Sequence, residues 1–203
     1  MKKGIGNFMK ILNKAIALAL CATMGVAVSA CGLGKNYDGT YKATYDCTDI
    51  FTDSMGMDAD LEGTIEVEFI LTLEKGEYEM TINSDKFEED FTTYMSNNMD
   101  AILKAAFGTD DEDEIAEYAV YMGYEDYDSL KAGMLDEMMA SVDFDDLDEA
   151  SDEGKYSVKG DTIVFESSEG GDDTEGTVKD DTITIEWEDE DFGDMELNFE
   201  LEK

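Results

Sequence analysis

The residue types that most often carry enzyme chemistry are scarce in this sequence. Its 203 residues include no histidine and no arginine, and only three cysteines. A Ser-His-Asp or Cys-His arrangement therefore cannot form, and neither a histidine metal ligand nor a guanidinium clamp is available. The 52 acidic residues provide many carboxylate pairs of the kind that glycosidases use, but this abundance removes the value of any one pair as evidence. We expect a protein that is not an enzyme.

One acidic segment has the spacing of a calcium loop. Residues 58–63 read Asp-Ala-Asp-Leu-Glu-Gly, which imitates the first half of an EF-hand loop with its glycine in the sixth place. The twelfth place, which requires a bidentate glutamate, is Phe69, and the segment runs into a strand pattern rather than a helix. We favour an acidic loop before a strand. A Ca²⁺ site made by Asp58, Asp60 and Glu62 is the alternative, and no other cofactor is expected.

The charge of the chain excludes several partners. All 52 acidic residues follow residue 30, together with ten of the fourteen lysines, so this part of the chain has a net charge of about −42. Nucleic acid would be repelled, because phosphate recognition needs lysine and arginine. Docking of the protein surface on an anionic membrane is disfavoured for the same reason.

The first 32 residues have the organisation of an export signal. Four lysines (Lys2, Lys3, Lys10 and Lys14) precede an apolar segment from Ala15 to Val28, which is too short and too rich in alanine for a comfortable membrane span. The segment ends in Val-Ser-Ala-Cys at residues 28–31, followed by Gly32. This arrangement resembles the lipobox of bacterial lipoproteins.

The resemblance to a lipobox implies how the chain is processed and where it lies. The Cys31 thiol would receive diacylglycerol, residues 1–30 would be removed, and residues 31–38 would form a lipidated tether. Acyl chains such as palmitate would then hold the protein on the outer face of a cell membrane, and the composition suits a bacterium with a single membrane. Cys21 would leave with the signal, so Cys47 has no partner for a disulfide. It shares a strand pattern with Tyr41, Ala43 and Tyr45, and we expect it to be a small buried residue.

The remaining chain changes its hydrophobic period twice. Apolar residues alternate with period two over residues 39–47, 65–73 and 78–82, which predicts three antiparallel strands. Helical spacing follows and predicts three helices, over residues 87–107, 109–122 and 127–142, before an acidic stretch at 143–153. Strand patterns then return as two hairpins, at 156–166 and 176–186, and a last strand at 195–201. The hairpins share Val-Lys-x-Asp-Thr-Ile, which indicates an internal repeat.

Two features of the strands resemble lipocalin-like barrels. Gly39-Thr40-Tyr41 is similar to their Gly-x-Trp opening, with tyrosine in place of tryptophan, and the repeated hairpins are similar to those of small lipocalin-like domains in bacterial lipoproteins. The resemblance implies an α+β fold in which an antiparallel meander of about eight strands forms a barrel, with a three-helix insertion after the third strand. We expect a single domain at residues 39–203, with the insertion at about 84–150.

The resemblance also implies a binding role, for a small apolar ligand or for another envelope component. Tyr41, Tyr45, Phe69 and Trp187 are the residues expected to contact a ligand inside the barrel. The helices carry tyrosine and methionine that form either plain core, which the helical spacing favours, or an adaptable apolar pocket: Tyr94, Met95, Met99, Tyr118, Tyr121, Met122, Met134, Met138 and Met139. We predict a lipid-anchored binding protein, with an acidic Ca²⁺-binding surface lipoprotein as the alternative.

Overall fold

The computed structural model describes residues 36–56, 61–142, 144, 147, 151–168, 173–189 and 193–203, without the side chains of 187–189, 193 and 194. The chain divides into two compact units. We call the described residues of Asp46–Glu66 and Asp85–Phe144 the helical unit. The described residues up to Tyr45, those of Val67–Ser84 and those after Phe144 form the barrel unit.

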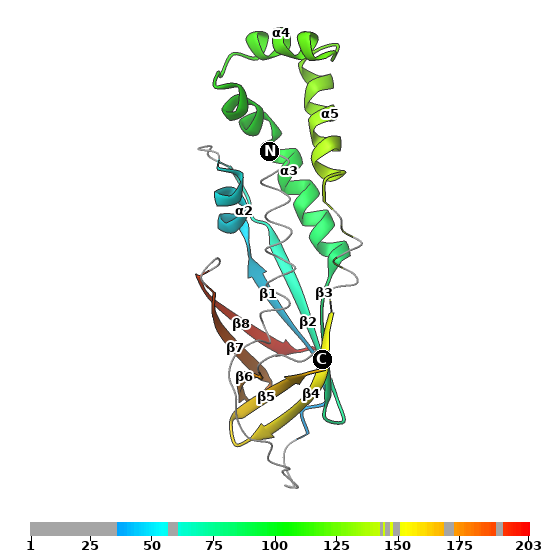
Figure 1. Cartoon of the computed structure of the whole chain (residues 1–203), viewed down its shortest axis with the longest axis vertical. Coiled ribbons are helices and arrows are strands. Elements are labelled where there is room, and N and C mark those ends of the chain that lie inside the picture. The colour runs from blue at the N-terminus through cyan, green and yellow to red at the C-terminus, as the bar shows by residue number, and fades with distance from the viewer. Residues whose placement is uncertain are drawn as a thin grey trace. The chain divides into compact units, whose positions relative to one another are not determined.

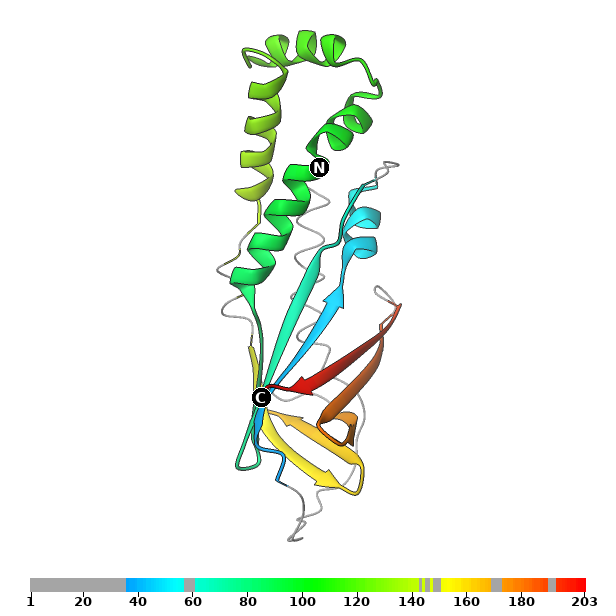
Figure 2. The same ribbon diagram turned by 180° about the vertical axis from the view of Figure 1, so that it is seen from behind.

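Eight antiparallel strands close into a barrel (Figures 1 and 2). Each strand pairs with the next along the chain, and β8 returns to pair with β1, where Tyr41 lies opposite Leu201. The strands are β1 (Gly39–Asp46), β2 (Glu66–Glu74), β3 (Glu77–Ile82), β4 (Ser151–Lys159), β5 (Thr162–Ser167), β6 (Thr174–Lys179), β7 (Thr182–Asp189) and β8 (Gly193–Leu201). The predicted meander and its closure are confirmed. Closure satisfies the hydrogen-bonding groups that an open sheet would leave at its edges.

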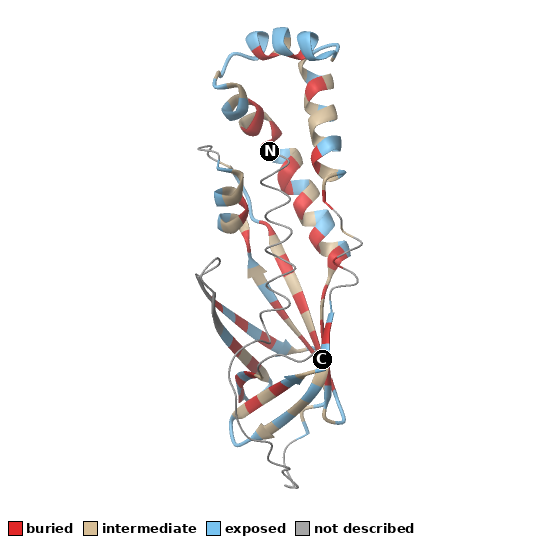
Figure 3. Ribbon diagram, in the orientation of Figure 1, coloured by how far each residue is buried: buried red, intermediate tan, exposed pale blue. Residues whose placement is uncertain are grey.

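Period-two alternation directs the apolar side chains of the barrel unit inward. On β2, Val67, Phe69, Leu71 and Leu73 are each at most 1% exposed, whereas the residues between them are partly exposed to solvent. The same alternation appears on β8, where Met195, Leu197 and Phe199 are buried between exposed acidic and polar residues. Figure 3 shows these alternating bands along the strands. A one-residue shift in register would turn each inward set toward water, so the pattern fixes the register.

The two repeated hairpins have the same strand register. Val158 pairs with Ile163 in β4–β5, and Val178 pairs with Ile183 in β6–β7. Each two-residue turn begins with a positive φ, which is 65° at Gly160 and 57° at Asp180. Glycine and aspartate tolerate this left-handed conformation better than most residues. The predicted internal repeat is therefore confirmed as a structural repeat.

The helical unit contains the predicted three-helix insertion and one helix that the sequence analysis missed. The insertion consists of α3 (Ser84–Phe107), α4 (Glu112–Met122) and α5 (Tyr127–Met139). The missed helix, α2 (Thr48–Met55), follows β1 directly. Its Phe51 is fully buried and makes an edge contact with Phe91 of α3, with ring centroids 5.4 Å apart. Such packing stabilises a helix of eight residues that would be marginal in isolation.

Two boundaries differ from the prediction. Cys47 lies after β1 as the N-cap of α2 rather than within a strand, although it is buried as expected, at 2% exposure. Residues 151–153, assigned to the acidic stretch, begin β4 instead. The second of them, Asp152, faces inward and is only 8% exposed. A buried carboxylate requires hydrogen-bond donors, and the barrel unit provides them.

Candidate functional site

Two of the four residues predicted to contact a ligand inside the barrel belong to its packed interior. Tyr41 and Phe69 are 3% and 1% exposed, and the Tyr41 hydroxyl donates to the Tyr37 carbonyl at 2.9 Å. Burial raises the pKa of Tyr41. Tyr45 is half-buried, and the side chain of Trp187 lies outside the described residues. A lumen with room for a ligand would leave the side chains facing it accessible to water, which Tyr41 and Phe69 are not.

A polar cluster lies in the described interior of the barrel unit. The Tyr78 hydroxyl donates to Asp152 Oδ2 at 2.5 Å, and Ser167 Oγ donates to Asp152 Oδ1 at 2.7 Å. Burial, followed by the hydrogen bond to Asp152, raises the pKa of Tyr78. The Tyr78 ring also contacts Phe165 edge to face, with centroids 5.1 Å apart. The carboxylate is thus satisfied by two hydroxyl donors, the buried Tyr78 and the partly buried Ser167, which is an arrangement that stabilises structure.

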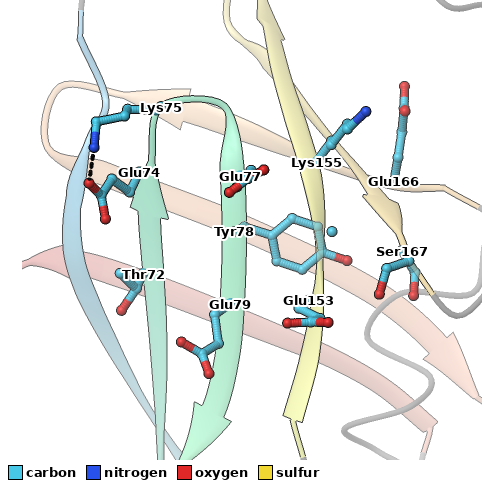
Figure 4. A pocket seen from close by; sticks show the side chains of 12 residues that line it. Thr72, Glu74, Lys75, Glu77, Tyr78, Glu79, Glu153, Lys155, Glu166 and Ser167 are labelled. Atoms are coloured by element: carbon cyan, nitrogen blue, oxygen red, sulfur yellow. Dashed lines mark hydrogen bonds and ion pairs between the residues drawn. The ribbon is translucent and has the colours of Figure 1, made fainter.

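A groove of about 740 Å³ lies over β2 to β5 of the barrel unit (Figure 4). Its lining includes five glutamates and two lysines, among them Glu77, Glu153 and Lys155. Lys75 pairs with Glu74 at 2.5 Å at the turn between β2 and β3. Most of these charged side chains are exposed, so the groove is a hydrated, charged surface. It does not match the apolar ligand that the sequence analysis expected.

Of the three residues predicted as calcium ligands, only Glu62 lies in the described part of the chain. Its side chain is exposed, and its backbone is held by Asn98 of α3, which accepts from Glu62 N at 2.7 Å and donates to Glu62 O at 2.8 Å. Asp58 and Asp60 lie outside the described residues. Across the part of the chain that is described, no group of three or more acidic or cysteine side chains is placed to bind a metal ion.

Two cysteines, Cys31 and Cys47, are expected to remain after processing, and the structure describes only Cys47. Cys31 lies outside the described residues. The Cys47 thiol donates to the Ile65 carbonyl at 3.3 Å, and burial raises its pKa to about 12. Since the thiolate is the reactive form of cysteine, both the burial and the raised pKa of Cys47 disfavour reaction of its thiol.

The tyrosine and methionine residues of the helices fall into two groups. Tyr94, Met95, Met99 and Met138 are at most 3% exposed, which confirms plain core at these positions. Met134 and Met139 are half-buried. Tyr118, Tyr121 and Met122 of α4 are 47%, 92% and 49% exposed, so the expectation that they would be core is wrong.

The exposed apolar residues gather at the C-terminal half of α4, and the sequence analysis overlooked one of them, Val120. It is 61% exposed. The buried face of α4 consists of Ile115 and Ala119, and the apolar residues around it are left exposed. Tyr118 stacks on Phe107 of α3 with centroids 5.6 Å apart. We define Tyr118, Val120, Tyr121 and Met122 as the α4 surface.

The sequence contains a signal that could have identified the α4 surface. Residues 118–122 are five consecutive apolar residues, and at 3.6 residues per turn they cover more than one full turn of helix. They cannot all face a single core. A cluster of large apolar side chains in water is unusual for a soluble domain and typical of an interaction site. The α4 surface is therefore the candidate functional site.

None of the described helices has the length and apolar character needed to cross a membrane. No protein-family model, curated protein or solved structure matches the chain.

Proposed function

We propose that this protein is a lipid-anchored, extracytoplasmic, non-catalytic binding protein that holds another component of the cell envelope through its helical unit. The observation that carries the proposal is the α4 surface, which exposes four large apolar residues on one short helix. Among the described parts of the chain, the barrel unit offers no comparable set of exposed large apolar side chains.

Of the two expected binding roles, a macromolecular partner is favoured over a small apolar ligand. A small apolar ligand would need space inside the barrel, but Phe69, Phe165 and Phe199 are each at most 1% exposed and fill the interior together with their neighbours. A macromolecular partner needs an accessible apolar surface with aromatic residues, which are enriched in protein interfaces. The α4 surface meets this requirement.

The anchoring part of the proposal rests on the Val-Ser-Ala-Cys sequence at residues 28–31. Two acyl chains on Cys31 would give stable membrane attachment, because each buried CH₂ contributes about 0.8 kcal/mol. Metabolic labelling with radioactive palmitate should mark the wild-type chain and leave the Cys31→Ser variant unlabelled and released from the membrane fraction. A labelled Cys31→Ser variant would contradict this part of the proposal.

The binding part is tested by photo-crosslinking in the native bacterium. Tyr121 is replaced by benzoylphenylalanine in the full chain, and a matched control places the same group at Glu166, an exposed position on β5. We expect a discrete crosslinked product with an envelope component from position 121 and none from position 166. Equal products from the two positions, or none from either, would contradict binding through the α4 surface.

A further inference from the structure

The α4 surface is a preformed feature of the helical unit. At the N-terminus of α4, Asp111 Oδ1 accepts from the backbone nitrogens of Asp113 and Glu114, at 3.0 and 3.4 Å. At its C-terminus Gly123 adopts a φ of 96°, and Tyr124 N donates to Ala119 O at 2.9 Å. Both ends of the helix are thus capped. A fixed helix loses little entropy on binding, which favours its use as a docking surface.

Three residues of the α4 surface lie on one face of the helix. Tyr118, Tyr121 and Met122 are related by steps of three and four residues, which places their side chains next to each other. The stacking of Tyr118 on Phe107 restrains one of the rings. Tyr121, which is 92% exposed, is the residue most available for insertion into a partner. Aromatic anchors of this kind dominate the binding energy of many interfaces.

The surroundings of the α4 surface are uniformly acidic. Between Gly108 and Ser129 the chain has no lysine and nine carboxylates: Asp110, Asp111, Glu112, Asp113, Glu114, Glu117, Glu125, Asp126 and Asp128. The two flanking lysines are already paired, Lys104 with Glu112 at 3.0 Å and Lys131 with Asp100 at 2.9 Å. The apolar residues therefore lie in a strongly negative potential.

This potential determines the chemistry of the partner. A second copy of the chain would bring together two acidic surfaces, and anionic lipid or nucleic acid would be repelled in the same way. We propose that the α4 surface docks a lysine- or arginine-rich protein segment that places an apolar side chain against Tyr118, Tyr121 and Met122. This inference rests on the proposed function and specifies the partner. The cations of the partner meet the carboxylates, and its apolar side chain covers the exposed rings.

The test uses three synthetic helical peptides of equal length as probes. The first combines lysine with leucine anchors, the second replaces each lysine by glutamate, and the third replaces each leucine by serine. Binding to residues 31–203 carrying Cys31→Ser is measured by isothermal titration calorimetry, and the contact is mapped by NMR chemical-shift changes. We expect only the first peptide to bind with shifts concentrated on α4, and the affinity to fall as salt is added.

Variants of the protein separate the apolar contribution from the charge contribution. Tyr121→Ser should weaken binding of the first peptide about tenfold or more. Asp113→Asn with Glu117→Gln should weaken it several-fold, whereas Glu175→Gln with Glu186→Gln, the same charge change on exposed positions of the barrel unit, should have less than about a twofold effect. Equal binding of the first and third peptides, with no effect of Tyr121→Ser, would show unspecific attraction to an acidic chain and overturn the inference. A dimer that Tyr121→Ser dissociates would overturn it in favour of a second copy.

The crosslink from position 121 distinguishes failure of this inference from failure of the proposed function. If no envelope component is crosslinked, the proposed function fails. If a component is crosslinked through a segment that peptide sequencing shows to be acidic or uncharged, the proposed function stands and the inference about the partner is overturned. A lysine- or arginine-rich contact segment, together with the peptide results, supports both.

Discussion

The barrel unit and the helical unit differ in how completely they bury their large apolar residues. In the barrel unit the alternation of strands separates apolar interior from charged exterior, as on β2 and β8. In the helical unit the core around Phe51, Phe87 and Phe91 is equally well buried, but α4 also exposes four large apolar residues. Burial of these residues would have stabilised the fold, so their exposure supports the proposed interaction.

The comparison indicates a division of labour between the units. A closed barrel leaves no sheet edge for pairing with another chain, and its described interior is packed with aromatic and aliphatic side chains. These features suit a stable scaffold. The helices of the insertion have core positions that are separate from those of the strands. Residues on the exposed faces of these helices can therefore be substituted without disturbing the strand register. Recognition is then expected in the insertion, in agreement with the general location of binding residues on connections between scaffold elements.

The largest expected effect is the removal of a core aromatic residue from the barrel unit. Phe69→Ala should lower the free energy of unfolding by about 3–5 kcal/mol, through lost burial and the cavity left behind. Urea denaturation monitored by circular dichroism measures the change. Thr72→Ala, at a partly exposed position on the same strand, is the control and should cost far less. If Phe69→Ala changes stability by less than about 1 kcal/mol, the interior is not close-packed, and a ligand inside the barrel becomes the better explanation.

The second effect concerns the buried carboxylate. Asp152→Ala should cost about 1–3 kcal/mol, because the Tyr78 and Ser167 hydroxyls lose their acceptor inside the barrel. In a Tyr78→Phe background Asp152→Ala should lower the free energy of unfolding by less, because the Tyr78 hydroxyl that would lose its acceptor is already absent. Chemical denaturation of the four chains gives a double-mutant cycle. Additive effects would show that Asp152 and Tyr78 are not coupled.

These two sites differ in how far the sequence reveals them. Phe69 belongs to a strict alternation of apolar and polar residues, so both its strand and its inward direction could be predicted. Asp152 could not, because a charged residue in an acidic stretch is normally exposed, and its two donors come from β3 and β5. Similarly, α2 was missed because its eight residues carry little pattern of their own and depend on the contact between Phe51 and Phe91. The α4 surface could be predicted only in part. Five consecutive apolar residues on a helix must be partly exposed, but which of them are exposed depends on how Ile115 and Ala119 pack.

A smaller, pH-dependent effect is expected from the ion pair that links α3 and α5. The hydrogen bond from Lys131 lowers the pKa of Asp100 below its usual value. The pair therefore stabilises the folded state above the pKa of about 3.9 that an unfolded aspartate has, and this contribution is lost as pH falls through the lower folded value. Asp100→Asn should cost a few tenths of a kcal/mol at pH 7, because the pair is partly exposed. Urea denaturation of both chains from pH 7 to pH 2 should show the difference vanish on the acid side. If the difference in free energy of unfolding persists at pH 2, it arises from packing rather than from the charge of Asp100.

The smallest expected effect on stability is at Tyr121. Tyr121→Ser should change the free energy of unfolding by no more than about 0.5 kcal/mol, because the side chain is 92% exposed and the two residues have similar helix propensities. Ile115→Ala, on the buried face of the same helix, is the matched control and should cost about 2–4 kcal/mol. Thermal and urea denaturation measure both. A loss of more than about 1 kcal/mol for Tyr121→Ser would mean that the ring supports the helical unit. The contrast between the two units would then disappear, because the exposed aromatic would be part of the fold. An unchanged stability combined with lost peptide binding would instead assign the α4 surface to recognition alone.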